Sequence, residues 1–274
     1  MDTGNIFTAL RERKPLIHHI TNQVTISECA NITLAAGGLP IMAHAVEEVA
    51  EMVANADALV LNLGTLTPNQ VEAMLLAGER ANDLQLPIIL DPVGAGTTRL
   101  RSESAKQLLT KLKISIIKGN AAEIAILAGG MAEIKGVESI AVSGNVDILA
   151  AALARETGAV VVATGAADLV TDGCRLFEVY NGHPFMAEVV GTGCMTASVM
   201  GCFAAVEHNY LHAAVSALVT INVAAEEAAL EATAPNAFKN KLFDKLYGLT
   251  PATLTSKQRF KKRVVENQTT DRMQ

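Results

Sequence analysis

The sequence predicts an α/β protein with a central, mostly parallel β-sheet that is covered by helices on both faces. Short apolar runs such as 58–63 and 87–91 are typical of strands that are buried on both faces of a sheet. Segments with helical periodicity lie between these runs, and alternating strands and helices favour a parallel sheet. No internal repeat and no linker rich in glycine, proline or serine interrupts residues 1–274, so we expect a single domain.

The composition narrows the class of protein. Half of the 274 residues are hydrophobic but only 4% are aromatic, so alanine, valine, leucine and isoleucine must build the core. A formal net charge of -6 argues against a nucleic-acid scaffold. The first residues lack the features of a signal peptide, and no apolar run reaches the ~20 residues that a membrane span needs. The four cysteines, Cys29, Cys174, Cys194 and Cys202, form no CxxC pair, as is typical of reduced thiols, so we expect a soluble cytoplasmic protein.

The N-terminal half alternates between the two kinds of element. Pro15 ends the first helix, and Pro68 begins another, because a proline in the first turn loses no hydrogen bond. The glycine pair 37–38 is a typical end of the second helix. The expected helices are 5–14, 24–36, 46–54 and 68–85, and the expected strands are 16–20, 39–43, 58–63 and 87–91.

The C-terminal half continues the alternation and then becomes helical. Asp172-Gly173 lies between the alternating segments 168–171 and 175–179, which predicts a β-hairpin. The other expected elements are helices at 102–112, from 120 onward, 146–157, 193–206, 211–231 and 237–247, and strands at 114–117 and 159–163. From about residue 256 the chain is basic and is expected to be a loosely ordered tail. It holds Lys257, Arg259, Lys261, Lys262 and Arg263.

Candidate site residues follow the predicted parallel strands. In open α/β sheets, ligands bind beyond the carboxyl ends of the strands, which all meet at one edge. This rule selects Asn22, Met42, Gly64, Asp91, Lys118 and Thr164. Most of the polar candidates therefore fall on the same edge of the predicted sheet.

A helix start at 191–198 provides a further part of the site. The sequence Gly191-Thr192-Gly193-Cys194 opens a run of small and apolar residues. Unpaired backbone N–H groups and the positive end of the helix dipole favour an anion there, and glycines let the backbone approach it. Cys194 is either a buried packing residue or a chemical group. At a helix N-terminus its thiolate is favoured, which makes it a candidate base or nucleophile.

Two carboxylates are candidates for metal binding. Asp91 could hold a hydrated magnesium ion, or it could simply form the turn that follows its strand. Glu123 could form a capping box with Asn120, be a second acidic group near the metal, or do both. Lys118 would then face nucleotide phosphates. Neither a P-loop nor a GxGxxG motif is present, so a triphosphate would have to use the backbone at 191–193.

Four motifs occur in order and together carry a resemblance. They are Thr21-Asn22-Gln23-Val24-Thr25, Asp91-Pro92-Val93-Gly94-Ala95, Lys118-Gly119-Asn120-Ala121-Ala122-Glu123 and Gly191-Thr192-Gly193-Cys194. The chain resembles the hydroxyethylthiazole kinase family, a branch of the ribokinase-like fold, over about residues 5–248. The ribokinase-like superfamily usually carries aspartate at the position of Cys194, and cysteine there is a mark of the thiazole kinases.

The resemblance implies phosphorylation of 4-methyl-5-(2-hydroxyethyl)thiazole by ATP and Mg²⁺, a salvage step toward thiamine, in a homotrimer with sites at subunit interfaces. It implies that Asp91 and Glu123 organise Mg²⁺, that Lys118, Thr164 and Gly193 contact ATP, that Asn22, Met42 and Gly191 contact the thiazole, and that Cys194 is the catalytic group beside the hydroxyl.

The chain departs from the family in two places. Lys118 replaces the usual arginine, so a point charge replaces a bidentate fork. Residues 234–238 replace a segment that resembles Gly-Pro-Gly-Ser-Phe.

Three alternatives remain open at this point. The protein could phosphorylate another small primary alcohol, of the hydroxymethylpyrimidine or pyridoxal type. It could be a hydrolase or acyltransferase with Cys194 as nucleophile, although no obvious His–carboxylate pair supports that class. His18 and His19 point to opposite faces of one predicted strand, so a structural role is favoured for them. The third alternative is a ligand-binding protein without catalysis.

Overall fold

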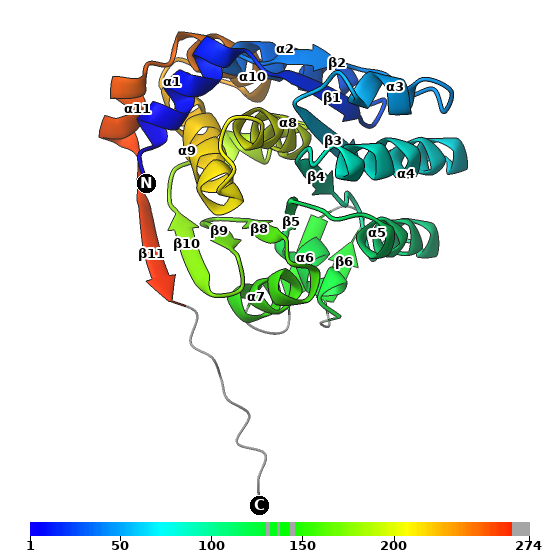
Figure 1. Cartoon of the computed structure of the whole chain (residues 1–274). Coiled ribbons are helices and arrows are strands. Elements are labelled where there is room, and N and C mark those ends of the chain that lie inside the picture. Colours follow the sequence, from blue (N-terminus) through cyan, green and yellow to red (C-terminus); the bar gives the residue numbers. More distant parts are fainter. Residues whose placement is uncertain (130–131, 136–137, 143–145, 265–274) are drawn as a thin grey trace, which may run out of the picture.

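A nine-stranded sheet forms the centre of the protein, and helices cover both of its faces (Figure 1). A computed structural model describes residues 1–129, 132–135, 138–142 and 146–264. The strand order is β11-β10-β9-β8-β5-β4-β3-β1-β2. Neighbouring strands among β2, β1, β3, β4, β5 and β8 are parallel. The pairs β8–β9, β9–β10 and β10–β11 are antiparallel. The predicted fold class is therefore confirmed.

The strands of the large sheet other than β11 lie close to the predicted positions. The parallel part consists of β1 Leu16–Ile20, β2 Leu39–Ile41, β3 Ala58–Asn62, β4 Ile88–Asp91, β5 Ile116–Asn120 and β8 Val160–Thr164. The antiparallel end contains β9 Asp168–Thr171, β10 Arg175–Val179 and β11 Phe260–Val264, and β9 and β10 form the predicted hairpin. A separate two-stranded sheet pairs β6 Ala132–Lys135 with β7 Glu138–Val142, where we predicted no element.

The helices separate into two layers, one on each face of the sheet. One layer contains α1 Thr3–Arg13, α2 Ile26–Ala36, α8 Thr192–Ala204, α9 Tyr210–Ala229, α10 Pro235–Gly248 and α11 Pro251–Lys257, with the short 3-10 helix η1 Pro184–Met186 against α10. The other contains α3 Val49–Val53, α4 Pro68–Asp83, α5 Arg99–Lys111, α6 Ala121–Leu127 and α7 Val146–Thr157. Within the described ranges, no helix is both long and apolar enough to cross a membrane.

Helix α8 is the most deeply placed helix. All of its residues from Met195 to Ala204 are buried, and it packs directly on β1, β3 and β4. The close approach depends on Gly201, because a Cβ there would lie 2.6 Å from Cγ2 of Val60 and 3.1 Å from Cγ2 of Ile17. This close packing places the N-terminus of α8 next to the carboxyl ends of the strands.

The prediction of a loosely ordered tail from about residue 256 is wrong for its first part. Residues 260–264 form β11, which pairs antiparallel with β10 and completes one edge of the sheet. The ring of Phe260 packs 6.0 Å from that of Phe177, and Arg263 forms an ion pair of 3.0 Å with Glu178. The basic residues hid this strand, because a run of cations is typical of a solvated segment. In the structure, Lys257, Arg259 and Arg263 form ion pairs with Glu227, Glu226 and Glu178. Residues 265–274 lie outside the described part.

Candidate active site

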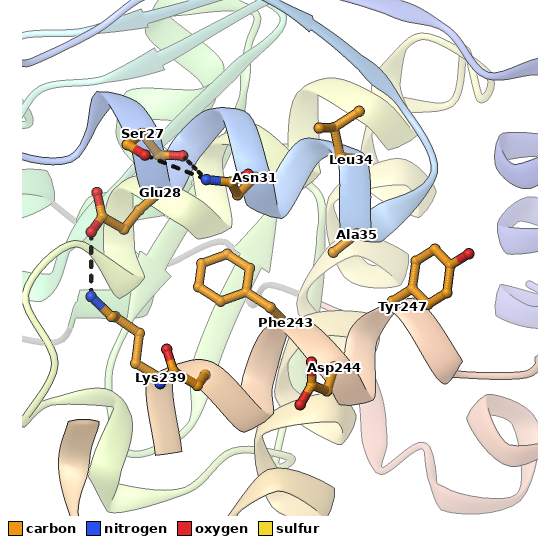
Figure 2. A pocket seen from close by; sticks show the side chains of 10 residues that line it. Ser27, Glu28, Asn31, Leu34, Ala35, Lys239, Phe243, Asp244 and Tyr247 are labelled. Carbon is orange, nitrogen blue, oxygen red and sulfur yellow. Dashed lines mark hydrogen bonds and ion pairs between the residues drawn. The ribbon is translucent and has the colours of Figure 1, made fainter. Parts of the chain in front are cut away.

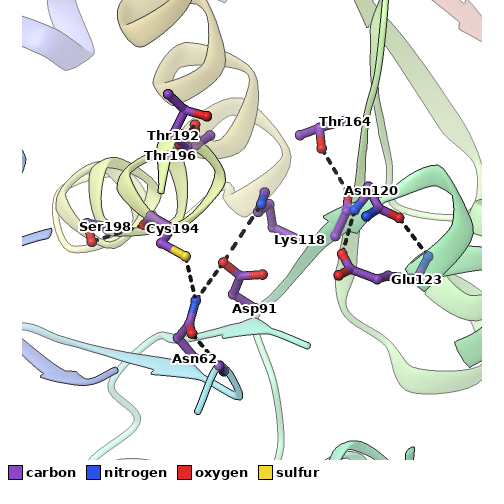
Figure 3. Close-up of polar contacts among 12 residues, drawn as sticks. Asn62, Asp91, Lys118, Asn120, Glu123, Thr164, Thr192, Cys194, Thr196 and Ser198 are labelled. Atoms are coloured by element: carbon purple, nitrogen blue, oxygen red, sulfur yellow. Dashed lines mark hydrogen bonds and ion pairs between the residues drawn. The ribbon is translucent and has the colours of Figure 1, made fainter. Parts of the chain in front are cut away.

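The carboxyl ends of three parallel strands meet the N-terminus of α8 (Figure 3). Asn62 ends β3 and lies opposite Asp91, which ends β4. Lys118 lies within β5, two residues before its end, where we had placed it after the strand. Cys194 lies in the first turn of α8 and faces this group. The topology therefore brings together residues that are far apart in the sequence.

Amide hydrogen bonds connect the thiol of Cys194 to this strand edge. Nδ2 of Asn62 donates to Oδ2 of Asp91 at 2.8 Å and lies 3.3 Å from Sγ of Cys194. Nδ2 of Asn22 donates to Oδ1 of Asn62 at 3.0 Å and lies 3.4 Å from the same sulfur. The backbone N–H of Gly64 also donates to Oδ1 of Asn62, so the orientation of the Asn62 amide is set on both sides. Sγ of Cys194 thus faces two N–H donors.

Lys118 supplies the cation of the cluster. Its Nζ lies 3.8 Å from Oδ2 of Asp91, and both side chains are almost fully buried, with exposures of 5% and 1%. Burial disfavours the ammonium, but the charges of Asp91 and Glu123 outweigh burial and raise the pKa of Lys118. A Cβ on Gly193 would lie 3.0 Å from this Nζ, so the glycine leaves room for the lysine beneath the start of α8.

Glu123 forms the predicted capping box. Oδ1 of Asn120 accepts from the backbone N–H of Glu123, and Oε2 of Glu123 accepts from that of Asn120 at 2.8 Å. The other oxygen, Oε1, accepts from the backbone N–H of Gly94 at 2.8 Å, which ties the loop after β4 to α6. Burial and then the charge of Asp91 raise the pKa of Glu123. The capping interpretation is confirmed, and the acidic role at a metal stays a prediction.

The pKa of the Cys194 thiol differs from our expectation. We expected the helix N-terminus to favour its thiolate, but burial, followed by the charge of Asp91, raises the pKa of Cys194. Lys118 and the amide of Asn62 act in the opposite direction without reversing the shift. The reason is that partial burial and the nearby negative charge of Asp91 both disfavour an anionic sulfur.

Gly191 and Thr164 belong to the two elements next to the cluster, the start of α8 and the end of β8. Gly191 is the N-cap of α8 at φ +93°, and a Cβ on it would lie 2.5 Å from Cγ2 of Thr25, whose hydroxyl donates to Oδ1 of Asn22. Thr164 ends β8 and pairs with Asn120, and its hydroxyl donates to the carbonyl of Gly119 at 3.3 Å.

Met42 is the predicted residue that the structure leaves apart from the cluster. It is half-buried and follows β2, which is separated from β4 by β1 and β3. Its predicted contact with a substrate therefore stays a prediction.

Sequence reasoning missed Asn62 and Arg101. Asn62 is the polar residue in the otherwise apolar run 58–63, a signal that could have identified it. Nη1 of Arg101 donates to the carbonyls of Leu63 at 3.0 Å and Val93 at 2.6 Å, and so holds the loops after β3 and β4 together. It comes from α5, and no local pattern connects it with these loops.

The donor set at this edge fits a hard divalent cation. Among the described residues, no group of three or more His, Cys, Asp or Glu side chains could form a metal cage. Asp91 and Glu123 are instead two buried carboxylates, and burial raises the pKa of each. Mg²⁺ is commonly held by one or two carboxylates together with phosphate oxygens and water, so these residues suit it.

A separate groove lies between α2 and α10 and has a volume of about 780 Å³ (Figure 2). Glu28 and Lys239 form an ion pair of 3.4 Å across it, and Phe243 and Tyr247 line it. None of the predicted site residues contributes to this groove. The functional cluster is therefore distinct from the groove.

Comparisons with known proteins agree with the resemblance. The model of the hydroxyethylthiazole kinase family matches residues 7–252. A protein of Methanocella arvoryzae named hydroxyethylthiazole kinase is 55% identical over 247 residues, which cover 90% of this chain and 93% of that protein. The solved structure of a hydroxyethylthiazole kinase protein from Pyrococcus horikoshii OT3 is 40% identical with a TM-score of 0.86, covering 95% of this chain and 98% of that one.

More distant structures share the fold alone. A ribokinase-like superfamily protein from Enterococcus faecalis is 13% identical with a TM-score of 0.63, and the match covers 89% of each chain. The family match over residues 7–252 and the identities of 55% and 40% show a closer relationship to the hydroxyethylthiazole kinases. The chain belongs to the hydroxyethylthiazole kinase family and has its ribokinase-like fold.

Proposed function

We propose that this protein transfers the γ-phosphoryl group of ATP to the hydroxyl of 4-methyl-5-(2-hydroxyethyl)thiazole in a Mg²⁺-dependent salvage step toward thiamine. The observation that carries the proposal is the convergence of Cys194, Asp91 and Lys118 at the start of α8. Phosphoryl transfer requires positioning and neutralisation of charge more than covalent chemistry, and a helix N-terminus beside a buried ammonium supplies both.

The nucleotide binds between the start of α8 and the ends of β5 and β8. The backbone at Gly193 and the ammonium of Lys118 neutralise phosphate oxygens, and Thr164 contacts the nucleotide from β8. Support comes from the short distance between the Gly193 Cβ position and Nζ of Lys118, and from the pairing of β5 with β8. Asp91 and Glu123 would hold Mg²⁺, which when bound supplies positive charge to the phosphates.

Cys194 accepts the proton of the substrate hydroxyl in this proposal. Its raised pKa means that the thiolate is scarce at neutral pH, which limits the rate of this step. The N–H groups of Asn62 and Asn22 face the sulfur and favour the thiolate over the thiol, because an anion is the better acceptor. Because little thiolate is present at neutral pH, the proposal predicts slow turnover.

The substrate and the assembly complete the proposal. Asn22, Met42 and Gly191 contact the thiazole, with the hydroxyl beside Cys194. The protein is a homotrimer with sites at subunit interfaces, as its family membership suggests. Light scattering on the protein as it elutes from a size-exclusion column tests the assembly. A monomeric mass would contradict the trimer.

Release of ADP tests the activity. Purified protein is incubated with ATP and the thiazole alcohol, with and without Mg²⁺, and with hydroxymethylpyrimidine or pyridoxal as competing alcohols. ADP release that requires both Mg²⁺ and the thiazole alcohol is expected. Faster ADP release with hydroxymethylpyrimidine or pyridoxal would show that this alcohol, and not the thiazole alcohol, is the preferred substrate. Calorimetric binding of the thiazole without ADP release would favour a binding protein, and ester turnover that needs no ATP and is blocked by iodoacetamide would favour a hydrolase.

A further inference from the structure

A buried carboxylate outside the proposed chemistry closes the turn after β8. Oδ1 of Asp168, the first residue of β9, accepts from the backbone N–H of Gly165 at 3.0 Å. Gly165 directly follows Thr164, the predicted nucleotide contact. Charge-assisted hydrogen bonds to backbone N–H groups are stronger than neutral ones, so Asp168 restrains the turn that carries Thr164.

Asn222 holds this carboxylate from a different element. Nδ2 of Asn222, a buried residue of α9, donates to Oδ2 of Asp168 at 2.8 Å and to the carbonyl of Asn181 at 2.9 Å. Both oxygens of Asp168 are therefore bound, one to the turn and the other to a helix of the core. These two hydrogen bonds hold the carboxylate of Asp168 in one orientation.

The network continues outward to the C-terminal segment. Nδ2 of Asn181 donates to the carbonyl of Lys257 at 2.9 Å, and Oδ1 of Asn181 accepts from the backbone N–H of Arg259 at 2.6 Å. Oε1 of Glu226 accepts from the backbone N–H of Gly182 and from Nη2 of Arg259, both at 2.7 Å. The segment that joins α11 to β11 thus anchors the inner hydrogen bonds.

Asp168 also acts on the cationic side of the site. Its negative charge is one of those that favour the ammonium of Lys118. The hydroxyl of Thr164 meanwhile bonds the carbonyl of Gly119, the residue after Lys118. The turn held by Asp168 is therefore connected to β5, the strand that carries this lysine.

We propose that Asp168 is a positioning residue for the nucleotide, holding the Thr164–Gly165 turn in its binding geometry through the pairing with Asn222. The proposal rests on the proposed function, in which this turn contacts ATP. It assigns Asp168 no contact with the reacting atoms. Its expected signature is a nucleotide-specific loss of affinity.

The test compares Asp168→Asn with Asp172→Asn as a matched control. Asp172 lies at the other end of β9 and also accepts backbone N–H bonds, from Cys174 and Arg175, but it holds the hairpin turn. Calorimetry with ADP and steady-state kinetics with ATP and the thiazole alcohol are measured for both variants and the unchanged protein. The expected result for Asp168→Asn is a rise of about tenfold or more in the ADP Kd and the ATP KM, with the thiazole KM within about twofold. Asp172→Asn keeps both values.

Unchanged nucleotide affinity in Asp168→Asn would overturn the proposal. A fall in kcat with both KM values unchanged would also overturn it, because a merely structural role lowers the active fraction without selecting the nucleotide. If Asp168→Asn does not fold, Asn222→Ser is measured in the same way, and normal ADP affinity there would be equally decisive. Absence of phosphorylation by the unchanged protein would instead contradict the proposed function, while its ADP affinity would still test the role of Asp168.

Discussion

The side-chain amide of Asn62 lies 3.3 Å from the sulfur of Cys194 and joins it to the carboxylate at the end of the neighbouring strand. One amide therefore serves the proposed base and a proposed magnesium ligand together. The arrangement explains how a half-buried thiol near a negative charge can still be oriented for chemistry. Substitutions at Cys194 and at Asn62 therefore test the roles of the two residues separately.

Replacing Cys194 tests its role as a base. Cys194→Ala should lower kcat by about tenfold or more, the usual scale of general-base effects. Cys194→Asp should retain or raise kcat, because a carboxylate can also accept the proton. Because the pKa of the thiol is raised, the rate of the unchanged protein should still increase with pH above neutrality. Full activity in Cys194→Ala, measured by ADP release, would remove the base role and leave positioning of the substrates as the mechanism.

Asn62→Ala should impair catalysis beyond its effect on stability. The substitution leaves the carboxylate of Asp91 and the sulfur of Cys194 without a shared donor, at a cost of about 1–3 kcal/mol in unfolding free energy. We expect kcat to fall by about tenfold. Asn82→Ala is the control, because the Asn82 amide bonds the backbone of Lys113 away from the site. Equal loss of kcat in both variants, measured on folded protein, would refute a specific role.

Gly191→Ala should disturb the predicted thiazole site. Alanine is strained at φ +93°, and its Cβ would lie 2.5 Å from Cγ2 of Thr25. Gly158→Ala shares a positive φ of +71° but meets no neighbouring atom within 4 Å. We expect Gly158→Ala to cost about 1 kcal/mol and Gly191→Ala more, with a raised KM for the thiazole alcohol only in the second. Urea unfolding and kinetics measure both, and similar behaviour would argue against a close contact at 191.

Acid should destabilise the protein through His19. Burial lowers the pKa of His19 from 6.5 to about 4 in the folded state. Between these values the unfolded chain binds a proton that the folded chain does not, so the unfolding free energy falls as pH decreases through this window. The loss attributable to this group is about 2 kcal/mol at pH 5 and up to about 3 kcal/mol near pH 4. Urea unfolding at about pH 7.5 and 5 measures it, and His19→Gln should reduce the difference. An unchanged difference in that variant would assign the effect elsewhere.

Removal of residues 259–274 should lower Tm. The truncation deletes β11, exposes the edge of β10 and removes Phe260 from Phe177. The lost burial of the half-buried ring alone corresponds to about 1–2 kcal/mol. Removal of residues 265–274 alone is the control, since it leaves β11 in place. Equal Tm values for the two truncations, measured by calorimetry, would show that β11 adds no stability.

The sequence by itself determined the fold class and most of the element order. Runs such as 58–63 and 87–91 show their burial through local periodicity, which neighbouring residues alone establish. Because parallel strands end at one edge, the sequence also predicted that Asp91 and Lys118 would lie together, and they do. The capping box of Asn120 and Glu123 was likewise predictable, because a cap involves adjacent turns only.

Only the tertiary structure decided the environment of these groups. The pKa of Cys194 is raised and not lowered, because burial and Asp91 act on it from other elements. Asn62, Arg101 and the pair of Asp168 and Asn222 gain their roles from partners far along the chain. The basic tail becomes a strand because β10 offers it a free edge. Local pattern determines which element forms, whereas desolvation and charge at a site depend on which elements meet.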